Sequence, residues 1–243
     1  MVTRRWVSAK QPAEIGTRDG LAYSLWLPDA EARAAGGVVI LHGAGSCKEN
    51  HHDFARAALG SGLAALAFDQ RGHGGSEGRL DGRALDDVAA MAALLRERTG
   101  GAPIALRGSS MGGYLAIASA SGARARAVVA ICPASADGLR RGLARGAFSF
   151  EADTVSLDRV LAEHDLEAAV EALEAPLLIL HADGDEVVPV EHSRQLARRM
   201  RGTASRLIVT PGGHHRSIQH DQEMQAASLR FIARALRRFI ANP

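Results

Sequence analysis

Residues 104–118 join a short apolar run, a Gly-x-Ser-x-Gly pentapeptide and a second apolar stretch with helical spacing. This order predicts a buried strand, a sharp turn with Ser110 at its tip, and a helix that begins at Met111. The turn leaves no room for side chains two residues to either side of the serine, which accounts for Gly108 and Gly112. A serine hydroxyl reacts only when a base within reach takes its proton. The pattern therefore makes Ser110 a candidate nucleophile.

Composition and charge narrow the class of protein. The chain has 243 residues, which is enough for one large core, and we expect a single domain over residues 1–243. Basic and acidic residues number 29 and 27 and are spread along the chain, so no basic stripe suggests a nucleic-acid partner. Two distant thiols, Cys47 and Cys132, are too few for a disulfide framework. With no apolar leader and no run of membrane-spanning length, we expect a cytoplasmic protein that does not bind membranes.

The expected strands and helices alternate along the chain. A hairpin is expected between residues 14 and 27 around Asp19-Gly20, at the antiparallel edge of a sheet. After it, short apolar runs alternate with segments of helical spacing, which predicts a parallel sheet with right-handed crossovers. The further strands are expected at 37–41, 63–68, 104–107, 127–131, 176–181 and 206–209, and the helices at 53–59, 83–99, 111–121, 165–173, 191–201 and from the end of the turn at 211–215 to about 240.

An insert at about 135–164 interrupts this alternation. Its composition is helical, and an apolar face includes Phe148 and Phe150. Such spacing is typical of ordinary packing, but a segment that follows a strand end is also suited to cover a site as a lid. Both interpretations stay open for the insert.

Four of the predicted strands end in loops that carry chemically active residues. The loops are 42–46, the turn at Ser110, 183–185 and 214–215. Because the carboxyl ends of parallel strands share one edge of a sheet, we expect these loops to lie together. Their order along the chain is serine, then acid, then histidine, as in a triad led by a serine on such a turn. Each of the last two loops offers two candidates, Asp183 or Asp185 and His214 or His215.

With these motifs the chain resembles the α/β-hydrolases over nearly its whole length. It is similar to the small-lidded serine esterases, both those like cinnamoyl or feruloyl esterases and those like monoacylglycerol lipases. The resemblance implies an α/β-hydrolase fold, with a mostly parallel eight-stranded sheet flanked by helices and a short helical lid. The segments that carry it are His42-Gly43, the Asp69-x-Arg71-Gly72-x-Gly74-x-Ser76 loop, Gly108-x-Ser110-x-Gly112, Asp183-Gly-Asp185-x-x-Val188-Pro189 and Pro211-Gly-x-x-His215.

The same resemblance assigns roles to single residues. Ser110 becomes the nucleophile, His215 the base that takes and returns its proton, and Asp185 the group that orients and stabilises the imidazole. The family places its acid three residues before Val-Pro, which selects Asp185 over Asp183. The Pro-Gly-x-x-His spacing likewise selects His215 over His214.

The resemblance also implies an oxyanion hole and a reaction. The backbone amides of Met111 and Ala44 would bind the developing oxyanion. The expected reaction is cleavage of small-molecule carboxylic esters through an acyl-enzyme, without metal or cofactor, in a monomer or homodimer. Phe148 and Phe150 on the lid favour small hydrophobic or aromatic acids. Alternatives with the same triad are thioester hydrolysis or aminopeptidase-like amide hydrolysis, and a further alternative is a non-catalytic ligand-binding protein on this fold.

Several other polar residues have a structural interpretation and a functional one. The resemblance implies that His42 anchors the loop that follows it. We expect His73 to brace the same region together with Asp69 and Arg71, with a role in substrate binding as the alternative. The pair His51-His52 and the two aspartates at 183 and 185 carry metal-ligand atoms, but neither pair belongs to a set with metal-site spacing. Arginines on the insert, such as Arg140, are expected to form a solvated face.

Overall fold

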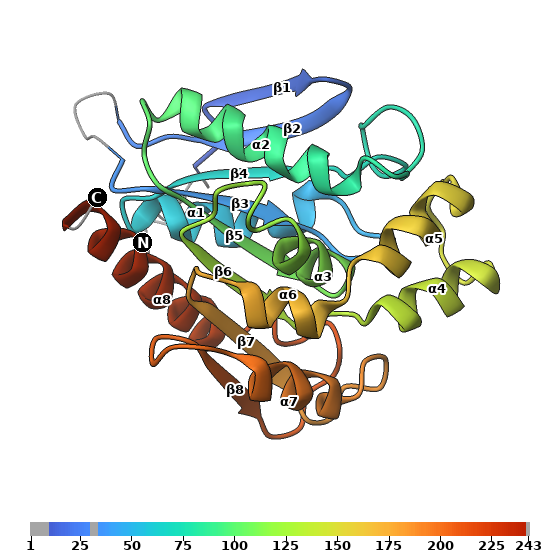
Figure 1. The fold of residues 1–243 in the computed structure, drawn as a ribbon. Helices are drawn as coiled ribbons and strands as arrows, with labels where there is room; N and C mark the ends of the chain where they lie inside the picture. Colours follow the sequence, from blue (N-terminus) through green and yellow to red (C-terminus); the bar gives the residue numbers. More distant parts are fainter. Residues whose placement is uncertain (1–9, 30–33, 242–243) are drawn as a thin grey trace, which may run out of the picture.

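The computed structural model describes residues 10–29 and 34–241. These residues form one eight-stranded sheet with the order β1-β2-β4-β3-β5-β6-β7-β8 (Figure 1). The strand β2 pairs antiparallel with β1 and β4, and the other neighbours are parallel. This topology confirms the expected α/β-hydrolase fold. The strands are β1 (Glu14–Arg18), β2 (Leu21–Trp26), β3 (Gly37–Leu41), β4 (Ala64–Phe68), β5 (Ile104–Ser109), β6 (Ala127–Ile131), β7 (Leu177–Ala182) and β8 (Arg206–Thr210).

The central strands are apolar because helices cover both of their faces. Every residue of β3, β4, β5, β6 and β7 is buried. Parallel strands in this position read as continuous apolar runs rather than as alternating ones. The two edge strands differ: β1 is largely exposed and β8 is half-buried. The predicted hairpin is confirmed, with its turn at Asp19-Gly20, where both residues have positive φ.

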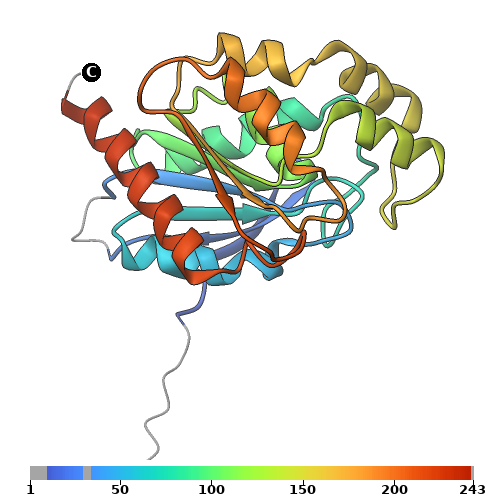
Figure 2. The same cartoon turned by 90° about the horizontal axis from the view of Figure 1, so that it is seen from below.

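Two layers of helices enclose the sheet (Figure 2). On one face α1 and α8 pack with Phe54, Ile232 and Leu236 in the core. On the other face a larger core includes Leu95 and Leu115. The helices of the first layer are α1 (His52–Gly60) and α8 (Gln222–Ala241), and those of the second are α2 (Ala84–Arg98), α3 (Met111–Ala118), α6 (Leu166–Ala172) and α7 (Val190–Arg199).

The insert forms two helices beyond the carboxyl ends of the parallel strands, α4 (Ala136–Ala144) and α5 (Thr154–Glu163), which lie together at the right of Figure 1. The Arg140 guanidinium joins them by an ion pair with Asp158, at 2.7 Å between Nε and Oδ1. The segment before α5 is held to the loop after β4, because the Leu80 amide donates to the Glu151 carbonyl over 2.9 Å. The insert is therefore fastened to a loop at the same end of the sheet as Ser110.

Two local details differ from the sequence expectations. A short 3₁₀ helix, η1 (Lys48–His51), precedes α1 and was not expected. It depends on a distant residue, since both the amide and the Nζ of Lys48 donate to the Asp69 carboxylate over 2.7 Å. The helix α3 ends at Ala118 rather than 121, as the chain turns into β6 through Arg124 with positive φ. In the described part of the chain, no helix is both long and apolar enough to cross a bilayer.

Candidate active site

Ser110 occupies the turn between β5 and α3, with φ of 52° and ψ of −117°. A residue other than glycine rarely adopts positive φ, and such strain persists only where the surroundings enforce it. Here the Ser110 amide donates to the Ile131 carbonyl over 2.9 Å, and the Ser110 carbonyl accepts from the amides of Ala134 and Tyr114, both at 3.0 Å. The backbone is thus held on β6 and α3 while the side chain remains partly exposed.

The glycines of the pentapeptide are required by close backbone approaches. A Cβ on Gly108 would lie 2.0 Å from the Gly112 carbonyl oxygen. A Cβ on Gly112 would lie 2.4 Å from the carbonyl oxygen of Leu41 and 2.5 Å from that of His42. These oxygens belong to the backbone and cannot rotate away. The turn can therefore pack against the end of β3 only with glycine at both positions.

His215 and Asp185 meet at the carboxyl ends of β7 and β8. The His215 Nδ1–H donates to Asp185 Oδ2 over 2.7 Å. The other carboxylate oxygen, Oδ1, accepts from the amides of Val187 and Val188, both at 2.8 Å. The Asp185 side chain is fully buried and that of His215 is 12% exposed. Both oxygens of the acid are thus occupied, and the imidazole is oriented with Nε2 facing away from the acid.

The charge of Asp185 is maintained by its hydrogen bonds. Burial opposes ionisation, but the bonds from His215, Val188, Val187 and Cys132 outweigh it, so the pKa of Asp185 lies below its usual value. The buried His181 also contacts Asp185 and its loop: His181 Nε2 lies 3.4 Å from Asp185 Oδ2 and 2.9 Å from the Val188 carbonyl oxygen. The carboxylate stays ionised near neutral pH and can stabilise a protonated His215.

The neighbouring aspartate and histidine have other partners. Asp183 accepts a hydrogen bond from the Gly212 amide and so ties the loop after β7 to the loop after β8. His214 is exposed, and its Nδ1 accepts from the Arg216 amide over 3.3 Å. The structure therefore brings His215 to Asp185 and leaves His214 and Asp183 outside that pair. It contains no hydrogen bond between Ser110 Oγ and His215 Nε2, a contact that often tightens only when substrate is bound.

The loop after β3 lies against the nucleophile turn. A Cβ on Gly43 would lie 3.3 Å from Ser110 Cβ, so the chain passes directly beside the serine. Ala44 follows in this loop, and Met111 is the first residue of α3, where backbone amides have no partner within the helix. Neither amide hydrogen-bonds to another residue in the described segments. The two segments that adjoin Ser110 thus each have a backbone donor without a described partner.

Two buried histidines hold this loop in place. His42 Nε2 accepts from the Gln70 amide over 3.0 Å, so its proton is on Nδ1, which donates to the Gly43 carbonyl over 2.8 Å. Burial lowers the pKa of His42 to about 4. His73 Nε2 accepts from the Gly45 amide over 3.2 Å. Both imidazoles act in the neutral form, as the loop anchor and the brace that the sequence predicted for them.

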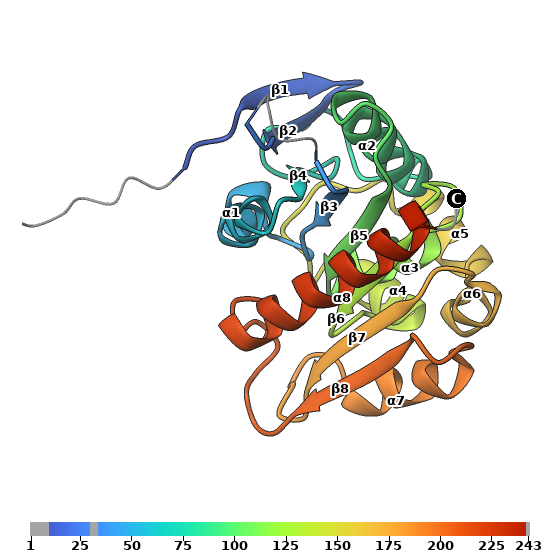
Figure 3. The same ribbon diagram turned by 90° about the vertical axis from the view of Figure 1, so that its left-hand side faces the viewer.

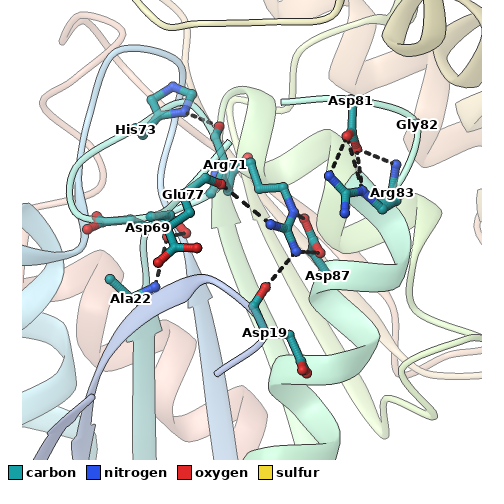
Figure 4. Close-up of polar contacts among 12 residues, drawn as sticks. Asp19, Ala22, Asp69, Arg71, His73, Glu77, Asp81, Gly82, Arg83 and Asp87 are labelled. Atoms are coloured by element: carbon teal, nitrogen blue, oxygen red, sulfur yellow. Dashed lines mark hydrogen bonds and ion pairs between the residues drawn. The ribbon is translucent and has the colours of Figure 1, made fainter. Parts of the chain in front are cut away.

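The loop that carries His73 is itself fixed by buried charges (Figure 4). His73 Nδ1 donates to the Arg71 carbonyl over 3.0 Å. The Arg71 guanidinium turns to the other side and pairs with Asp87 of α2, at 2.9 Å between Nε and Oδ2. It also donates to the Asp19 carbonyl in the β1–β2 turn over 2.8 Å. The motif of residues 69–76 thus connects the hairpin, α2 and the loop beside Ser110.

A small apolar pocket adjoins Met111 beneath the insert. Phe150 stacks on His73 with ring centroids 4.4 Å apart, and Phe148 stacks on Phe150 at 5.2 Å. The free space is about 10 Å³, roughly one water, so the insert closes the pocket in this conformation. Phe148 and Phe150 line the pocket, as the sequence expected, whereas the lining residues of α3 and α5 were not expected here, although their periodic apolar spacing is visible in the sequence. The full lining is Leu80, Met111, Tyr114, Leu115, Leu139, Leu143, Phe148, Phe150, Leu157 and Leu161.

One group of potential metal ligands occurs among the described residues. Cys132, Asp185 and His215 offer ligand atoms within 4.8 Å of one another. Asp185 and His215 already bond to each other, and burial raises the pKa of the Cys132 thiol, which disfavours the thiolate that a metal needs. The pairs that the sequence raised as metal alternatives, His51-His52 and Asp183-Asp185, do not form such a group.

Comparison with known proteins gives consistent matches. The family described as "Serine aminopeptidase, S33" matches residues 32–156 and 154–223. A monoacylglycerol lipase of Mycolicibacterium smegmatis is 30% identical, with 80% of this chain and 85% of the relative covered. Among solved structures, a Paleococcus ferrophilus monoacylglycerol lipase has 22% identity and a TM-score of 0.67, covering 89% of this chain and 98% of its own. Est1E from Butyrivibrio proteoclasticus with bound ferulic acid has 21% identity and a TM-score of 0.69, covering 94% and 98%.

Proposed function

The chain belongs to the serine aminopeptidase S33 family of α/β-hydrolases, and on that premise we propose that it hydrolyses carboxylic esters of small hydrophobic or aromatic acids through an acyl-enzyme on Ser110. The contact between His215 Nδ1 and Asp185 Oδ2, at 2.7 Å, carries this proposal. It fixes the tautomer that leaves Nε2 as the base. The same contact is what separates His215 from His214 and Asp185 from Asp183 as candidates.

Acylation begins when His215 Nε2 takes the proton of Ser110 Oγ, which attacks the ester carbonyl carbon. The tetrahedral intermediate collapses as His215 gives this proton to the alkoxide oxygen that leaves as the alcohol. Water then gives a proton to His215 and attacks the acyl-enzyme, and the same proton returns to Ser110 as the acid departs. Asp185 remains a carboxylate throughout and stabilises the imidazolium that forms twice.

Two backbone amides stabilise the oxyanion in both steps. Met111 directly follows Ser110, Ala44 directly follows Gly43 in the loop beside the serine, and neither of these two amides has another partner in the described segments. One such donor is worth about 3 kcal/mol of the barrier in a serine hydrolase, so the position of the loop after β3 matters as much as the triad. His42 and His73 act indirectly, by holding Gly43 and Gly45 where Ala44 can reach the oxyanion.

The apolar pocket supports the choice of acyl group. All of its lining side chains are apolar apart from the hydroxyl of Tyr114, which donates to the His164 carbonyl over 2.9 Å. Because the pocket is closed, an acyl group can enter only when Phe148, Phe150 or the helices of the insert move. The related monoacylglycerol lipase and the ferulic acid bound to Est1E point to the same class, esters whose acid part is apolar or aromatic.

The test is hydrolysis of a panel of p-nitrophenyl esters, hydroxycinnamate esters and monoacylglycerols. The variants are Ser110→Ala, His215→Ala and the matched control His214→Ala. We expect the first two changes to lower kcat/KM by about 10⁴-fold or more, as removal of the serine or histidine does in other triads. His214→Ala should stay within about threefold of the unchanged protein, because His214 lies outside the triad pair.

A fluorophosphonate probe supplies an independent readout, since it labels only an activated serine. Labelling of Ser110 together with hydrolysis of at least one ester class supports the proposal. A folded protein that resists the probe and leaves the whole panel intact would instead be a non-catalytic ligand-binding protein on this fold.

The family's description favours one alternative, hydrolysis of the amide bond at a peptide amino terminus. Such a substrate carries an ammonium group, which needs an acidic partner beside the triad. Glu186 is the nearby candidate, since its carboxylate accepts from the His215 amide over 3.2 Å. Aminoacyl p-nitroanilides belong in the same panel, as do acyl thioesters. Higher kcat/KM on an anilide than on every ester, lost in Glu186→Gln, would replace the esterase proposal with the aminopeptidase one.

A further inference from the structure

A large groove lies at the opposite end of the sheet from Ser110. It has a volume of about 1250 Å³ and lies where β6, β7 and β8 begin. Its walls are the last residues of α3 and α6 and the second half of α8. Figure 3 looks at this end of the molecule, where α8 crosses in front of the central strands, while α4 and α5 lie at the other end in Figure 1.

Arginines dominate the walls of this groove. Arg124 and Arg126 come from the loop before β6, and Arg206 opens β8. A further four, Arg230, Arg234, Arg237 and Arg238, belong to α8. The only acidic residue in the lining is Glu174. A chain of net charge +2 thus gathers seven positive charges around one cavity.

These seven guanidinium groups lack anionic partners. Within residues 10–29 and 34–241, none of them forms an ion pair or a hydrogen bond through its side chain. Other arginines of the chain do have carboxylate partners, as Arg71 has Asp87 and Arg98 has Glu14. The positive charges of the groove also act on the neighbouring Arg96. Burial first, and then the charges of Arg124 and Arg126, lower the pKa of Arg96. The groove therefore has positive charge that Glu174, the one acidic residue of its lining, balances only in small part.

The aromatic residues in the groove add a second kind of contact. The Arg126 guanidinium lies 3.9 Å from the centroid of the Phe239 ring, and that of Arg206 lies 5.9 Å from the Phe231 ring. Stacking on a ring leaves the edge of a guanidinium free, and that edge binds phosphate oxygens in pairs. A planar ligand ring can in turn lie on the outer face of a stacked guanidinium. The groove thus combines sites for several phosphates with a flat surface for an aromatic group.

We propose that this groove binds a nucleoside di- or triphosphate, with the phosphates on the arginines of α8 and the base against Arg126, Arg206 and their phenylalanines. The groove, at about 1250 Å³, is slightly larger than the usual small-molecule site of about 300–1000 Å³, so it has room for a whole nucleotide, and a single phosphate would fill only a corner. The concave shape excludes a flat bilayer surface as the occupant. The proposal is independent of the reaction at Ser110.

The test is calorimetric titration of the full chain with ATP, without added metal, at about 50 and 200 mM salt. The groove variant is Arg230→Gln with Arg234→Gln. The matched control is Arg145→Gln with Arg159→Gln, which removes two exposed arginines of the insert that also lack ion pairs. We expect ATP to bind with a micromolar Kd that weakens with salt. The groove variant should weaken binding at least tenfold and the control less than twofold.

Comparison of ligands tests each half of the proposal. Adenosine and inorganic triphosphate should each bind at least tenfold more weakly than ATP, because each makes only one kind of contact. Ester hydrolysis and thermal unfolding of the groove variant should match the unchanged protein, which shows that it is folded. The proposal is overturned if ATP does not bind below millimolar concentration, or if both variants weaken it equally. Equal binding of triphosphate and ATP, or binding only of a polyglutamate peptide or anionic vesicles, also overturns it.

Discussion

The two ends of the sheet use charge in opposite ways. At the carboxyl end, three buried charged side chains have oppositely charged partners: Lys48 pairs with Asp69, Arg71 with Asp87, and Asp185 with His215 once it is protonated. At the amino end, seven arginines line a groove without a described partner. The same strands support both ends, so the difference lies in the loops and helix ends that leave the sheet.

This difference agrees with the two roles proposed for these ends. A reaction at Ser110 requires a base and two amides at fixed positions, and an error of about 1 Å can cost about 10²-fold in rate. The carboxyl-end loops are accordingly constrained by glycines in tight contacts and by hydrogen bonds to buried histidines. A groove that attracts an anion needs only a positive field and side chains that can adapt. Mutations at the carboxyl end of the sheet should therefore lower stability and activity much more than mutations at the amino end.

The largest effect is expected at the turn that carries Ser110. In Gly112→Ala, the new Cβ would meet two backbone oxygens at 2.4 and 2.5 Å, so the end of β3 must shift. We expect a loss of about 3 kcal/mol or more of unfolding free energy, together with most of the activity. The matched control is Gly122→Ala, near the amino end of the sheet. The nearest atom to its new Cβ would be the Ser119 carbonyl oxygen, at 3.7 Å. It should change stability by less than about 1 kcal/mol. Urea unfolding measures both, and similar losses in the two variants would contradict the comparison.

Mild acid should destabilise the carboxyl end through its buried histidines. Burial lowers the pKa of His42 to about 4 and that of His51 to about 3, below the value of about 6.5 in the unfolded chain. Between these values the unfolded state binds protons that the folded state does not, so stability falls as the pH drops below about 6.5. Each histidine should account for about 2 kcal/mol between pH 7 and pH 5. Urea unfolding across this range measures the loss.

A variant assigns the acid effect to its source. His51→Leu removes one of the two groups and also the buried Nε2 that lacks a hydrogen-bond partner in the described structure. The slope of unfolding free energy against pH should then fall by about one proton between pH 6 and pH 5. An unchanged slope would mean that His51 is not held neutral in the folded protein.

The smallest effect is expected from the arginine groove. In Arg230→Gln with Arg234→Gln, two exposed charges disappear that form no described ion pair, and repulsion among the remaining five decreases. Unfolding free energy should change by less than about 0.5 kcal/mol, with ester hydrolysis within twofold. Thermal unfolding and the p-nitrophenyl ester assay measure both quantities. A several-fold loss in kcat/KM would show that the groove and the site at Ser110 are coupled, and would contradict the comparison.

Much of the fold was predictable because its signals are local. The apolar run 37–41 and the similar runs at 63–68 and 127–131 are continuous, as strands buried on both faces must be. The hairpin turn at Asp19-Gly20 was expected from residue types that tolerate positive φ. The 3₁₀ helix at Lys48 was missed, because it depends on Asp69, twenty-one residues further along the chain.

Local pattern therefore determined the order of elements, the parallel sheet and the candidate nucleophile Ser110, because strand, turn and helix periods depend on near neighbours. Motif spacing in the resemblance pointed to Asp185 and His215, and the tertiary structure brings these two residues together from loops thirty residues apart. Tertiary structure alone decided two other matters. It set His73 on the Gly45 amide, and it gathered arginines from three separate segments into one groove. Each of these depends on where distant strands end in space, and the spacing of residues along the chain does not contain that information.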